Sequence, residues 1–209
     1  MNINAIVLAA GKGTRMKSNE PKCAHIIIDR PMVQYVIDAL KEIHVVNIIV
    51  VIGFGREKMK QILNSGVKFA IQDDQLGTAH AVKQAKPYLK DKEGITLITI
   101  GDMPFIKKET LESLIVNHIQ KKADLTVLSV EHPQPYGYGR IIRDENNRVI
   151  EIVEDRDCTR DQAAIREINS AVYAINNFLL FKHIDEIKPS NNQNEFYLTD
   201  LIKIFNEHK

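Results

Sequence analysis

The sequence predicts an α/β protein in which helices flank a mostly parallel sheet, with a small antiparallel extension in the second half. Two observations predict it. Over the first 130 residues, short apolar runs alternate with longer segments of helical period, which is the pattern of βαβ units. After Val130, a stretch rich in Pro, Gly and Tyr precedes two strand-like runs around a polar turn, which is typical of an antiparallel hairpin.

The first-half elements follow from hydrophobic periodicity. Val33, Val36, Ile37 and Leu40 recur at i, i+3, i+4 and i+7, which predicts an amphipathic helix that Pro31 can begin. Further helices are predicted over 56–63, 78–85 and 108–120, and strands over 5–8, 47–52, 67–71, 95–100 and 125–130. Because these connections cover both faces of the sheet, we expect ligands beyond the carboxyl ends of the strands.

The second-half elements are shorter and less regular. Strands are predicted over 140–143 and 149–153, on either side of the polar turn, and over 168–175. Helices are predicted over 178–184 and 197–205. No internal repeat or long linker separates the halves, so we expect one domain over residues 1–209.

The composition is that of one compact globular unit. Of the 209 residues, 44% are hydrophobic and 26% charged, enough to bury a core without a disulfide or structural metal. A formal charge of +1 offers no broad basic surface for nucleic acid or an anionic membrane. No apolar run reaches the ~20 residues of a transmembrane helix, and Cys23 and Cys158 form no CxxC pair. We therefore expect a cytoplasmic protein.

A glycine-rich loop follows the first predicted strand, in the run Leu-Ala-Ala-Gly-Lys-Gly-Thr-Arg-Met over residues 8–16. Small residues let backbone N–H groups approach an anion closely, which favours a phosphate cradle. Met16 stands where the dinucleotide fingerprint has its third glycine, and the P-loop spacing is also missing. Arg15 and Lys22 are placed to neutralise phosphates, whereas Lys12 fits a solvated side chain better. The alternative is an ordinary glycine turn with surface cations.

A carboxylate follows another strand. Asp102 comes after Gly101 at the end of the predicted strand 95–100, so we expect it at the ligand edge of the sheet. Mg²⁺ bound to substrate phosphates commonly needs one or two protein carboxylates, with water completing its octahedron. Alternatively, Asp102 caps the helix that begins near Lys107 or closes an Asx turn.

A third polar segment, residues 72–80, reads Gln-Asp-Asp-Gln-Leu-Gly-Thr-Ala-His and joins a strand to a helix. A base-sized group could meet the Gln72 amide and the backbone around Gly77 at the start of that helix. A glutamine side chain both donates and accepts, which suits the imide edge of a pyrimidine. An ordinary helix cap among surface residues is the alternative.

Further motifs complete a pattern that runs through almost the whole chain. They are Pro21-Lys22, Gly101-Asp102, Gly-Tyr-Gly-Arg over 137–140, Glu154, Glu-Ile-Asn over 167–169 and Glu-x-Tyr-Leu-Thr-Asp over 195–200. With the loop 8–16 and the segment 72–81, they resemble the uridylyltransferase half of bacterial bifunctional N-acetylglucosamine-1-phosphate uridylyltransferases. Many sugar nucleotidyltransferases share single motifs, but Gln-x-x-Gln-Leu-Gly-Thr together with Gly-Tyr-Gly-Arg is far more specific.

The resemblance implies a Rossmann-like fold of the nucleotide-diphospho-sugar transferase type. It also implies a reaction in which a sugar phosphate attacks the α-phosphorus of UTP and pyrophosphate leaves. Arg15 and Lys22 would hold the phosphates, and Asp102 the Mg²⁺ cofactor, as the catalytic residues. Nucleotide contacts are implied for Leu8, Ala9, Gly11, Gln72, Gln75, Gly77 and Thr78, with Gln72 and Gly77 reading uracil. Sugar contacts are implied for Gly139, Glu154, Asn169, Tyr197 and Thr199, so that residues 1–130 serve mainly the nucleotide and 131–209 mainly the sugar.

The chain departs from the family at several places. The Val-Glu-Gly-Val-Asn segment, whose Asn is the family's second metal ligand, is not among the 209 residues. The hexapeptide β-helix of the acetyltransferase half is not among them either, so we expect no acetyl transfer and take no oligomeric state from the family. Ile100 replaces a usual Tyr, and Ser170-Ala171 replaces a usual Thr-Gly. The added methyl of Ala171 beside the implied sugar pocket bears on which sugar is used.

The leading hypothesis is an enzyme that makes a UDP-sugar from UTP and a hexose 1-phosphate, foremost N-acetylglucosamine 1-phosphate. One alternative is a catalytically weak nucleotide-sugar binding module or partner-dependent subunit. Another is a nucleotidyltransferase that uses CTP or a different sugar 1-phosphate. The seven histidines show no HxH or HExxH spacing, and we expect them to have surface or core roles without a metal.

Overall fold

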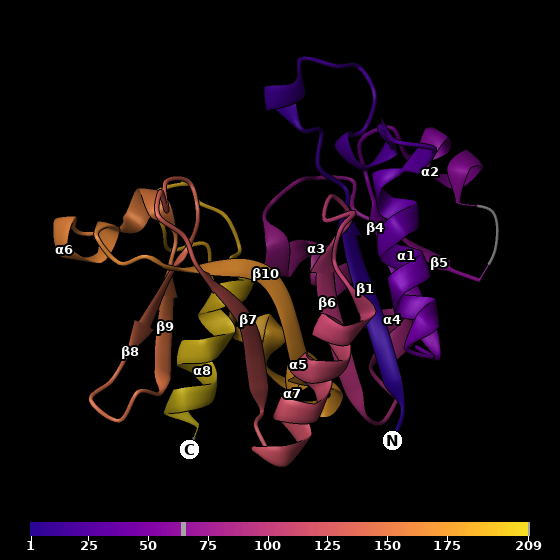
Figure 1. The fold of residues 1–209 in the computed structure, drawn as a ribbon. Helices are drawn as coiled ribbons and strands as arrows, with labels where there is room; N and C mark the ends of the chain where they lie inside the picture. Colours follow the sequence, from indigo (N-terminus) through magenta and orange to yellow (C-terminus); the bar gives the residue numbers. More distant parts are fainter. Residues whose placement is uncertain (64–65, 209) are drawn as a thin grey trace.

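The computed structural model describes residues 1–63 and 66–208, apart from the side chain of Arg15. Within them, eight strands form one sheet in the order β5-β4-β1-β6-β10-β8-β9, with β7 also paired to β10 (Figure 1). The first-half strands run parallel, β1 lying between β4 and β6 and β4 pairing with β5. They are β1 Ile3–Ala9, β4 Asn47–Ile52, β5 Lys68–Ile71 and β6 Ile95–Ile100. The prediction of a mostly parallel sheet is confirmed.

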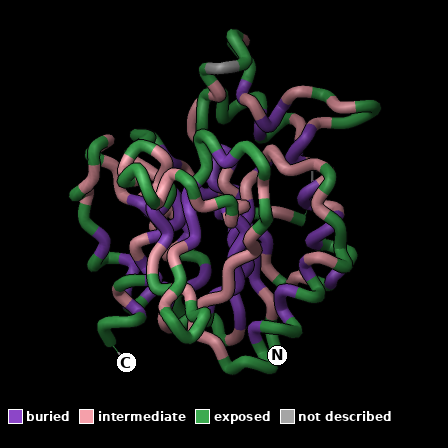
Figure 2. The backbone as a smooth tube through the Cα atoms, turned by 60° about the vertical axis from the view of Figure 1, so that its left-hand side comes forward, coloured by how far each residue is buried: buried purple, intermediate pink, exposed green. Residues whose placement is uncertain are grey.

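Helices cover both faces of this sheet because its central strands are apolar on both sides. In β1, Ala5 and Val7 enter one core cluster while Ile6 enters the other, as the alternation of a buried strand requires. The first cluster contains buried residues of α1 Met32–Glu42, α2 Arg56–Ile62 and α5 Lys108–Gln120. The second contains those of α3 Thr78–Gln84, α4 Lys86–Leu89, α7 Asn177–His183 and α8 Leu201–Glu207. Buried backbone is concentrated along the central strands in Figure 2.

The second half joins the sheet through one long strand, β10 Glu167–Asn176. It runs antiparallel to β6, to β7 Leu125–Glu131 and to β8 Arg140–Arg143. The strand β8 forms the predicted hairpin with β9 Val149–Val153. The pairing of β10 with β7 shifts register between Asn169 and Tyr173, which marks a β-bulge. The antiparallel extension therefore continues the parallel sheet rather than forming a separate layer.

Several short elements were not predicted. They are the 3₁₀ turns η1 Thr14–Met16, η2 Lys22–Ala24, η3 Asp155–Asp157, η4 Ile184–Glu186 and η5 Leu198–Asp200, the helices α4 and α6 Arg160–Ala163, and the strands β2 Ile26–Ile27 and β3 Arg30–Pro31. The helix predicted over 197–205 was wrong in its first turn. Tyr197 is extended, η5 follows, and α-helix begins only at Leu201 and runs on to Glu207. The Leu198 N–H is bound by Thr78 Oγ1 at 2.9 Å, so tertiary contact decides this turn.

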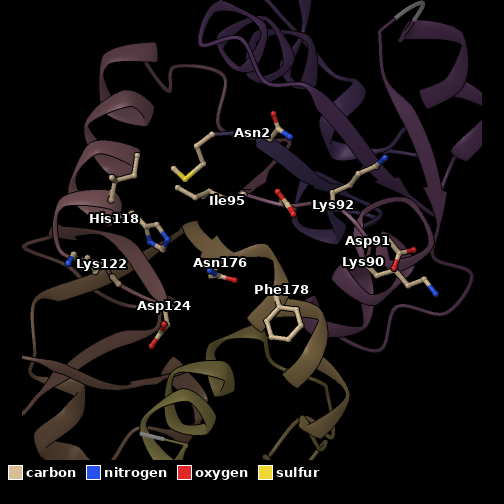
Figure 3. Close-up of a pocket in the computed structure, with 15 residues that line it drawn as sticks. Asn2, Lys90, Asp91, Lys92, Ile95, His118, Lys122, Asp124, Asn176 and Phe178 are labelled. Atoms are coloured by element: carbon tan, nitrogen blue, oxygen red, sulfur yellow. The ribbon is translucent and has the colours of Figure 1, made fainter.

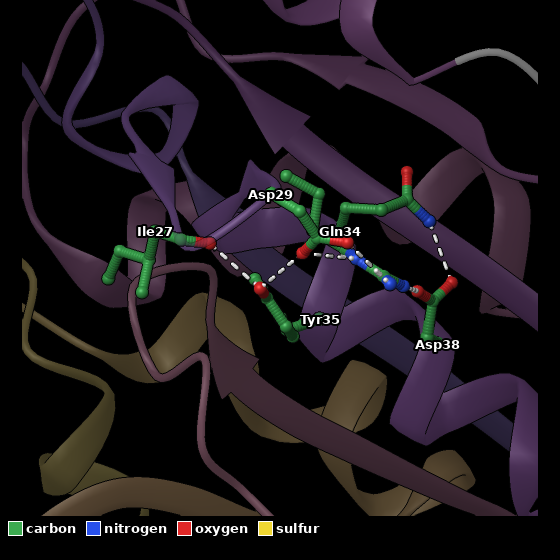
Figure 4. A network of polar contacts seen from close by, with 6 residues as sticks. Ile27, Asp29, Gln34, Tyr35 and Asp38 are labelled. Atoms are coloured by element: carbon green, nitrogen blue, oxygen red, sulfur yellow. Dashed lines mark hydrogen bonds and ion pairs between the residues drawn. The ribbon is translucent and has the colours of Figure 1, made fainter.

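A polar network fixes the β2–β3 hairpin to α1 (Figure 4). The Tyr35 hydroxyl lies 2.7 Å from both the Ile27 carbonyl oxygen and Asp29 Oδ1. Arg30 donates to Asp29 at 3.2 and 3.1 Å and to Asp38 Oδ2 at 3.1 Å. The hairpin directly follows η2, so this network anchors the segment that carries Lys22.

None of the helices in the described part of the chain combines the length and the hydropathy that crossing a membrane requires.

Candidate active site

The candidate site lies where the parallel strands β1, β4 and β6 end. The Gly101 N–H donates to the Leu8 carbonyl at 2.9 Å, which ties the end of β6 to the end of β1. The Phe54 N–H donates to the Ala10 carbonyl at 3.1 Å, which ties the loop after β4 to the same place. The glycine-rich loop, the Gly53–Gly55 turn and Asp102 therefore share one edge of the sheet, as the topology predicts.

The glycine-rich loop folds back against Lys22. Gly13 has φ +66, and a Cβ there would lie 2.6 Å from Lys22 Cβ, so only glycine fits this approach. At Gly11, in contrast, no heavy atom lies within 4 Å of the place that a Cβ would take. One glycine thus packs the loop onto the protein while the other leaves its backbone open to a ligand. The Arg15 side chain lies outside the described residues, so its predicted phosphate contact stays a prediction.

Lys22 and Asp102 meet at this edge. The Lys22 ammonium contacts Asp102 Oδ2, and the carboxyl side chain is 17% exposed against 36% for the lysine. The helix-cap alternative for Asp102 is wrong, because the N-cap of α5 is Lys107 and no side chain caps that end. The sequence therefore placed the cation and the carboxylate together correctly.

Cys23 lies buried near this pair. Its Sγ lies 3.1 Å from the place that a Cβ on Gly101 would take. Burial raises the pKa of the thiol to about 12, and the charge of Asp102 adds to this. A buried thiol with a raised pKa is poorly suited to act as a nucleophile, and Cys23 packs against Gly101.

The Gln72 side chain is turned into the protein. Gln72 is 3% exposed, and its Nε2 donates to the Gly77 carbonyl at 3.3 Å and lies 2.9 Å from His80 Nδ1. Gln75 Nε2 donates to the Gln72 carbonyl at 3.3 Å. The amide nitrogen of Gln72 thus orders the loop that leads to Gly77, and this internal bond was not foreseen from the sequence.

The loop before α3 is clamped by the segment that leads into η5. Gly77 has φ +113, and a Cβ there would lie 2.5 Å from the Phe196 carbonyl oxygen. Phe196 donates to Leu76 at 2.8 Å and accepts from Ala79 at 2.9 Å. The Thr78 hydroxyl accepts from Leu198, which engages it within the protein. The N-cap of α3 is Gly77, so no side chain caps this helix, and an ordinary glycine cap stays open as the alternative for this segment.

Four of the five predicted sugar contacts form a connected wall. The Asn169 N–H donates to the Gly139 carbonyl at 2.8 Å. A Cβ on Gly139 would lie 3.3 Å from Glu154 Oε1, which in turn accepts from Thr199 Oγ1 at 3.4 Å. Tyr197, the fifth, is 8% exposed and its hydroxyl accepts from the Gln193 amide.

The carboxyl group of Glu154 is poorly solvated. Burial raises its pKa above the usual range, and the nearby charges of Asp157, Asp200 and Asp155 raise it further. The hydrogen bond from Thr199 partly opposes this by lowering the pKa. A group of this kind is suited to hydroxyl groups of a ligand, because it accepts hydrogen bonds with little competition from water.

Arg140 supports this wall and was not among the predicted site residues. Its guanidinium is fully buried and donates to Asp155 Oδ1 at 2.9 Å, to the Ala163 carbonyl at 3.4 Å and to the Tyr138 carbonyl. It thus joins the loop before β8 to the segment after β9. The signal in the sequence was an arginine that opens an apolar run within Gly-Tyr-Gly-Arg, since a charge there needs buried partners.

Cavities lie at both ends of the parallel strands. One of about 420 Å³ adjoins the candidate site and is lined by residues that include Gly53, Gln72 and Gln75. Another of about 800 Å³ lies at the opposite edge, where β6 begins at Ile95 and β10 ends at Asn176 (Figure 3). None of the described residues that line the second cavity is a predicted site residue.

Comparisons with known proteins agree with this architecture. Residues 5–166 match the MobA-like NTP transferase domain. The chain is 46% identical over 204 residues to the bifunctional protein GlmU of Staphylococcus epidermidis, a match covering 98% of this chain and 45% of that protein. It is 44% identical over 200 residues to the GlmU of Geobacillus sp. strain WCH70, covering 96% and 44%. The chain thus spans somewhat less than half the length of the curated relatives it matches.

Solved structures show the same fold at low sequence identity. The crystal structure of a UDP-glucose pyrophosphorylase complexed with UDP-glucose has a TM-score of 0.83 at 18% identity, covering 100% of this chain and 88% of that one. A putative glucose-1-phosphate thymidylyltransferase from Bacillus anthracis, in complex with a sucrose, has a TM-score of 0.79 at 20% identity, covering 99% and 83%. The predicted fold and the resemblance found in the motifs are confirmed. The chain belongs to the family of MobA-like NTP transferase domains.

Proposed function

We propose that the chain is a nucleotidyltransferase that forms a UDP-sugar and pyrophosphate from UTP and a hexose 1-phosphate, foremost N-acetylglucosamine 1-phosphate. The observation that carries the proposal is the meeting of Lys22 and Asp102 beside a glycine-rich loop whose backbone at Gly11 is open. The identity of 46% and 44% to the two GlmU relatives, together with the resemblance of the motifs, supports the choice of UTP and of the sugar.

A divalent cation, which we propose to be Mg²⁺, fits the residues present. Asp102 supplies a carboxylate at the edge where phosphates would lie, and its ion pair with Lys22 is consistent with a cation beside it. One protein carboxylate with phosphate oxygens and water suits Mg²⁺. When bound, the ion would neutralise charge on the triphosphate and on the leaving pyrophosphate.

The proposed reaction needs positioning and charge neutralisation rather than a protein nucleophile. A phosphate oxygen of the sugar 1-phosphate forms a bond to the α-phosphorus of UTP, and the bond to pyrophosphate breaks, its electrons leaving with the pyrophosphate. Each unscreened charge pair at 4 Å costs about 4 kcal/mol at an effective dielectric near 20, so cations must converge there. Lys22 and Arg15 would supply them, and the backbone at Gly11 would donate to phosphate oxygens.

The remaining predicted contacts divide the chain by substrate. Leu8, Ala9, Gln72, Gln75, Gly77 and Thr78 would surround the nucleotide. Gly139, Glu154, Asn169, Tyr197 and Thr199 would surround the sugar. Because the Gln72 amide nitrogen is bound internally, its carbonyl oxygen is the atom left to accept from the uracil imide N–H. Both cysteines are free thiols, which supports a cytoplasmic location.

The test is pyrophosphate release by the purified chain with Mg²⁺, each nucleoside triphosphate and several sugar 1-phosphates. We expect UTP with N-acetylglucosamine 1-phosphate to be the best pair. Thermal stabilisation by UTP without turnover would instead identify a binding module, and better use of CTP or another sugar would reassign the substrates.

Two substitutions test the catalytic pair. Asp102→Ala should abolish pyrophosphate release and leave the fold intact, as judged by circular dichroism. Lys22→Arg should also lower kcat strongly, because the planar guanidinium of arginine does not replace the compact ammonium of lysine in a crowded phosphate site. Asp91→Asn, at an exposed aspartate outside the site, is the matched control. Full activity of the Asp102 variant would refute the role of this carboxylate.

A further inference from the structure

Three side chains that could ligate a metal converge where α7 and α8 end. His183 Nδ1 lies 2.7 Å from Glu186 Oε1, and His208 Nε2 lies 3.0 Å from Glu186 Oε2. One donor atom from each residue can be chosen so that all three lie within 4.8 Å of one another. His183 is the last residue of α7, Glu186 ends η4, and His208 is the C-cap of α8. Three separate elements thus contribute one donor each.

The cluster is fixed on its inner side and open on its outer side. The His183 side chain is 4% exposed, and its ring meets the Phe205 ring edge-on, with centroids 5.6 Å apart. His208 is 52% exposed and Glu186 44%. An ion can therefore arrive from solvent, whereas the buried imidazole is already desolvated and oriented before it arrives.

The donor atoms of the cluster suit one cation. The ring centroids of His183 and His208 are 4.6 Å apart, so both rings and the Glu186 carboxylate lie close enough to contact one ion. The two imidazoles and the carboxylate together offer two nitrogen donors and one oxygen donor to one ion.

We propose that His183, Glu186 and His208 bind one divalent transition-metal cation of the zinc type, which fastens the end of α8 to α7. Imidazole and carboxylate donors suit Zn²⁺ and its first-row neighbours, whereas Mg²⁺ prefers oxygen ligands alone. Water would complete the coordination, as in open zinc sites with three protein ligands. The binding exchanges two hydrogen bonds to Glu186 for coordination. Since a neutral imidazole can carry its proton on the other ring nitrogen, no net deprotonation is needed.

The site stabilises the fold and stands apart from the proposed reaction. The cluster includes none of the proposed nucleotide or sugar contacts, and it does not include Asp102. The helix α8 follows directly on η5, which contains Thr199 of the proposed sugar wall. A metal bound at the C-terminal end of α8 would therefore restrain the helix that follows this wall. The sequence did not predict this site, because its two histidines lie at the ends of two different helices and form no local metal-binding motif.

The test is calorimetric titration of ZnCl₂ into the purified full chain, free of any affinity tag and in excess MgCl₂ to occupy Asp102. We expect one Zn²⁺ per chain and a rise in Tm with Zn²⁺ that further MgCl₂ does not reproduce. His208→Ala and Glu186→Gln should each weaken Zn²⁺ binding more than about tenfold and remove the Tm rise. Both side chains are roughly half exposed, so these variants should fold, as the Tm without zinc will show.

His44→Asn is the matched control. His44 is exposed and has φ +58, a backbone conformation that asparagine also adopts. This variant should bind Zn²⁺ as the unchanged chain does. Equal Zn²⁺ affinity in the unchanged chain and in both cluster variants would overturn the proposal, as would no detectable Zn²⁺ binding at millimolar concentration. Because the readouts are affinity and Tm, the result is independent of whether the chain transfers nucleotides.

Discussion

At the scale of single residues, two positions near the proposed sugar wall are held at an energetic cost. Ala171 has φ +61 within the bulge of β10, a left-handed conformation that disfavours a side chain with a Cβ. Its N–H donates to Asn169 Oδ1 at 2.9 Å, which supports the conformation. Glu154 is partly buried, and the charges of three other carboxylates raise its pKa further. An unfavourable backbone conformation such as that of Ala171 persists only where the surrounding structure imposes it, and such conformations are common at functional sites.

Ala171→Gly is expected to stabilise the chain. Relief of the left-handed conformation is worth about 1–2 kcal/mol, and the greater freedom of glycine in the unfolded chain offsets about 0.4–1 kcal/mol of this. We expect a net gain of about 0.5 kcal/mol in the free energy of unfolding, measured by urea denaturation. Ala164→Gly, at φ −77, is the control and should lower stability. An equal loss in both variants would show that Ala171 is not strained.

Glu154→Gln is expected to raise stability at neutral pH and to flatten its pH dependence. Because the pKa of Glu154 is raised in the folded state, the folded chain binds this proton more tightly than the unfolded chain. Stability therefore falls as the pH rises from the ordinary glutamate pKa through the raised one, and the loss stays constant above it. The advantage of the variant, measured by urea denaturation, should shrink toward pH 4. A constant advantage at all pH values would contradict this, and a raised KM for the sugar phosphate would mark the functional cost.

At the scale of elements, the sequence predicted best where periodicity and tertiary packing agree. The strands β4, β6, β8 and β9 and the helix α5 have the predicted bounds, because apolar runs and helical repeats define them locally. The 3₁₀ turns were missed because they are short and held by distant contacts, as Leu198 is by Thr78. The meeting of Lys22 and Asp102 was predictable because β1 and β6 are parallel and their carboxyl ends meet at one edge of the sheet. The internal hydrogen bond of Gln72 depends on side-chain geometry that sequence spacing does not reveal.

The β2–β3 hairpin gives a test at this scale. Tyr35→Phe removes the hydroxyl that lies 2.7 Å from Ile27 O and Asp29 Oδ1. We expect a loss of about 1 kcal/mol in the free energy of unfolding by chemical denaturation, the ordinary worth of such hydrogen bonds. Tyr136→Phe, at a ring that is 79% exposed, should change it little. If the two variants are equally stable, the network does not hold the hairpin to α1.

At the scale of the whole molecule, one strand, β10, joins the two halves of the chain. It pairs with β6 of the first half, with β8 of the hairpin and with β7. Buried residues of α7 and α8 share a core cluster with those of α3, so the second half also packs on the first-half helices. If the first half binds the nucleotide and the second half the sugar, as proposed, the two halves would differ in the ligand they contact but would still depend on each other for stability.

The whole chain is therefore expected to unfold in a single transition, and two probes can follow the halves separately. Four of the six tyrosines follow residue 130, so tyrosine fluorescence reports mainly the second half, and no tryptophan masks it. In a Cys158→Ser variant, the remaining thiol is Cys23, which is 5% exposed and reports unfolding of the first half through its reaction with a thiol reagent. Equal urea midpoints from both probes are expected, because losing β10 exposes the edge of β6 and leaves β7 unpaired. A thiol that stays protected after the tyrosine signal has changed would mean that the first half folds alone, and that the chain has two domains.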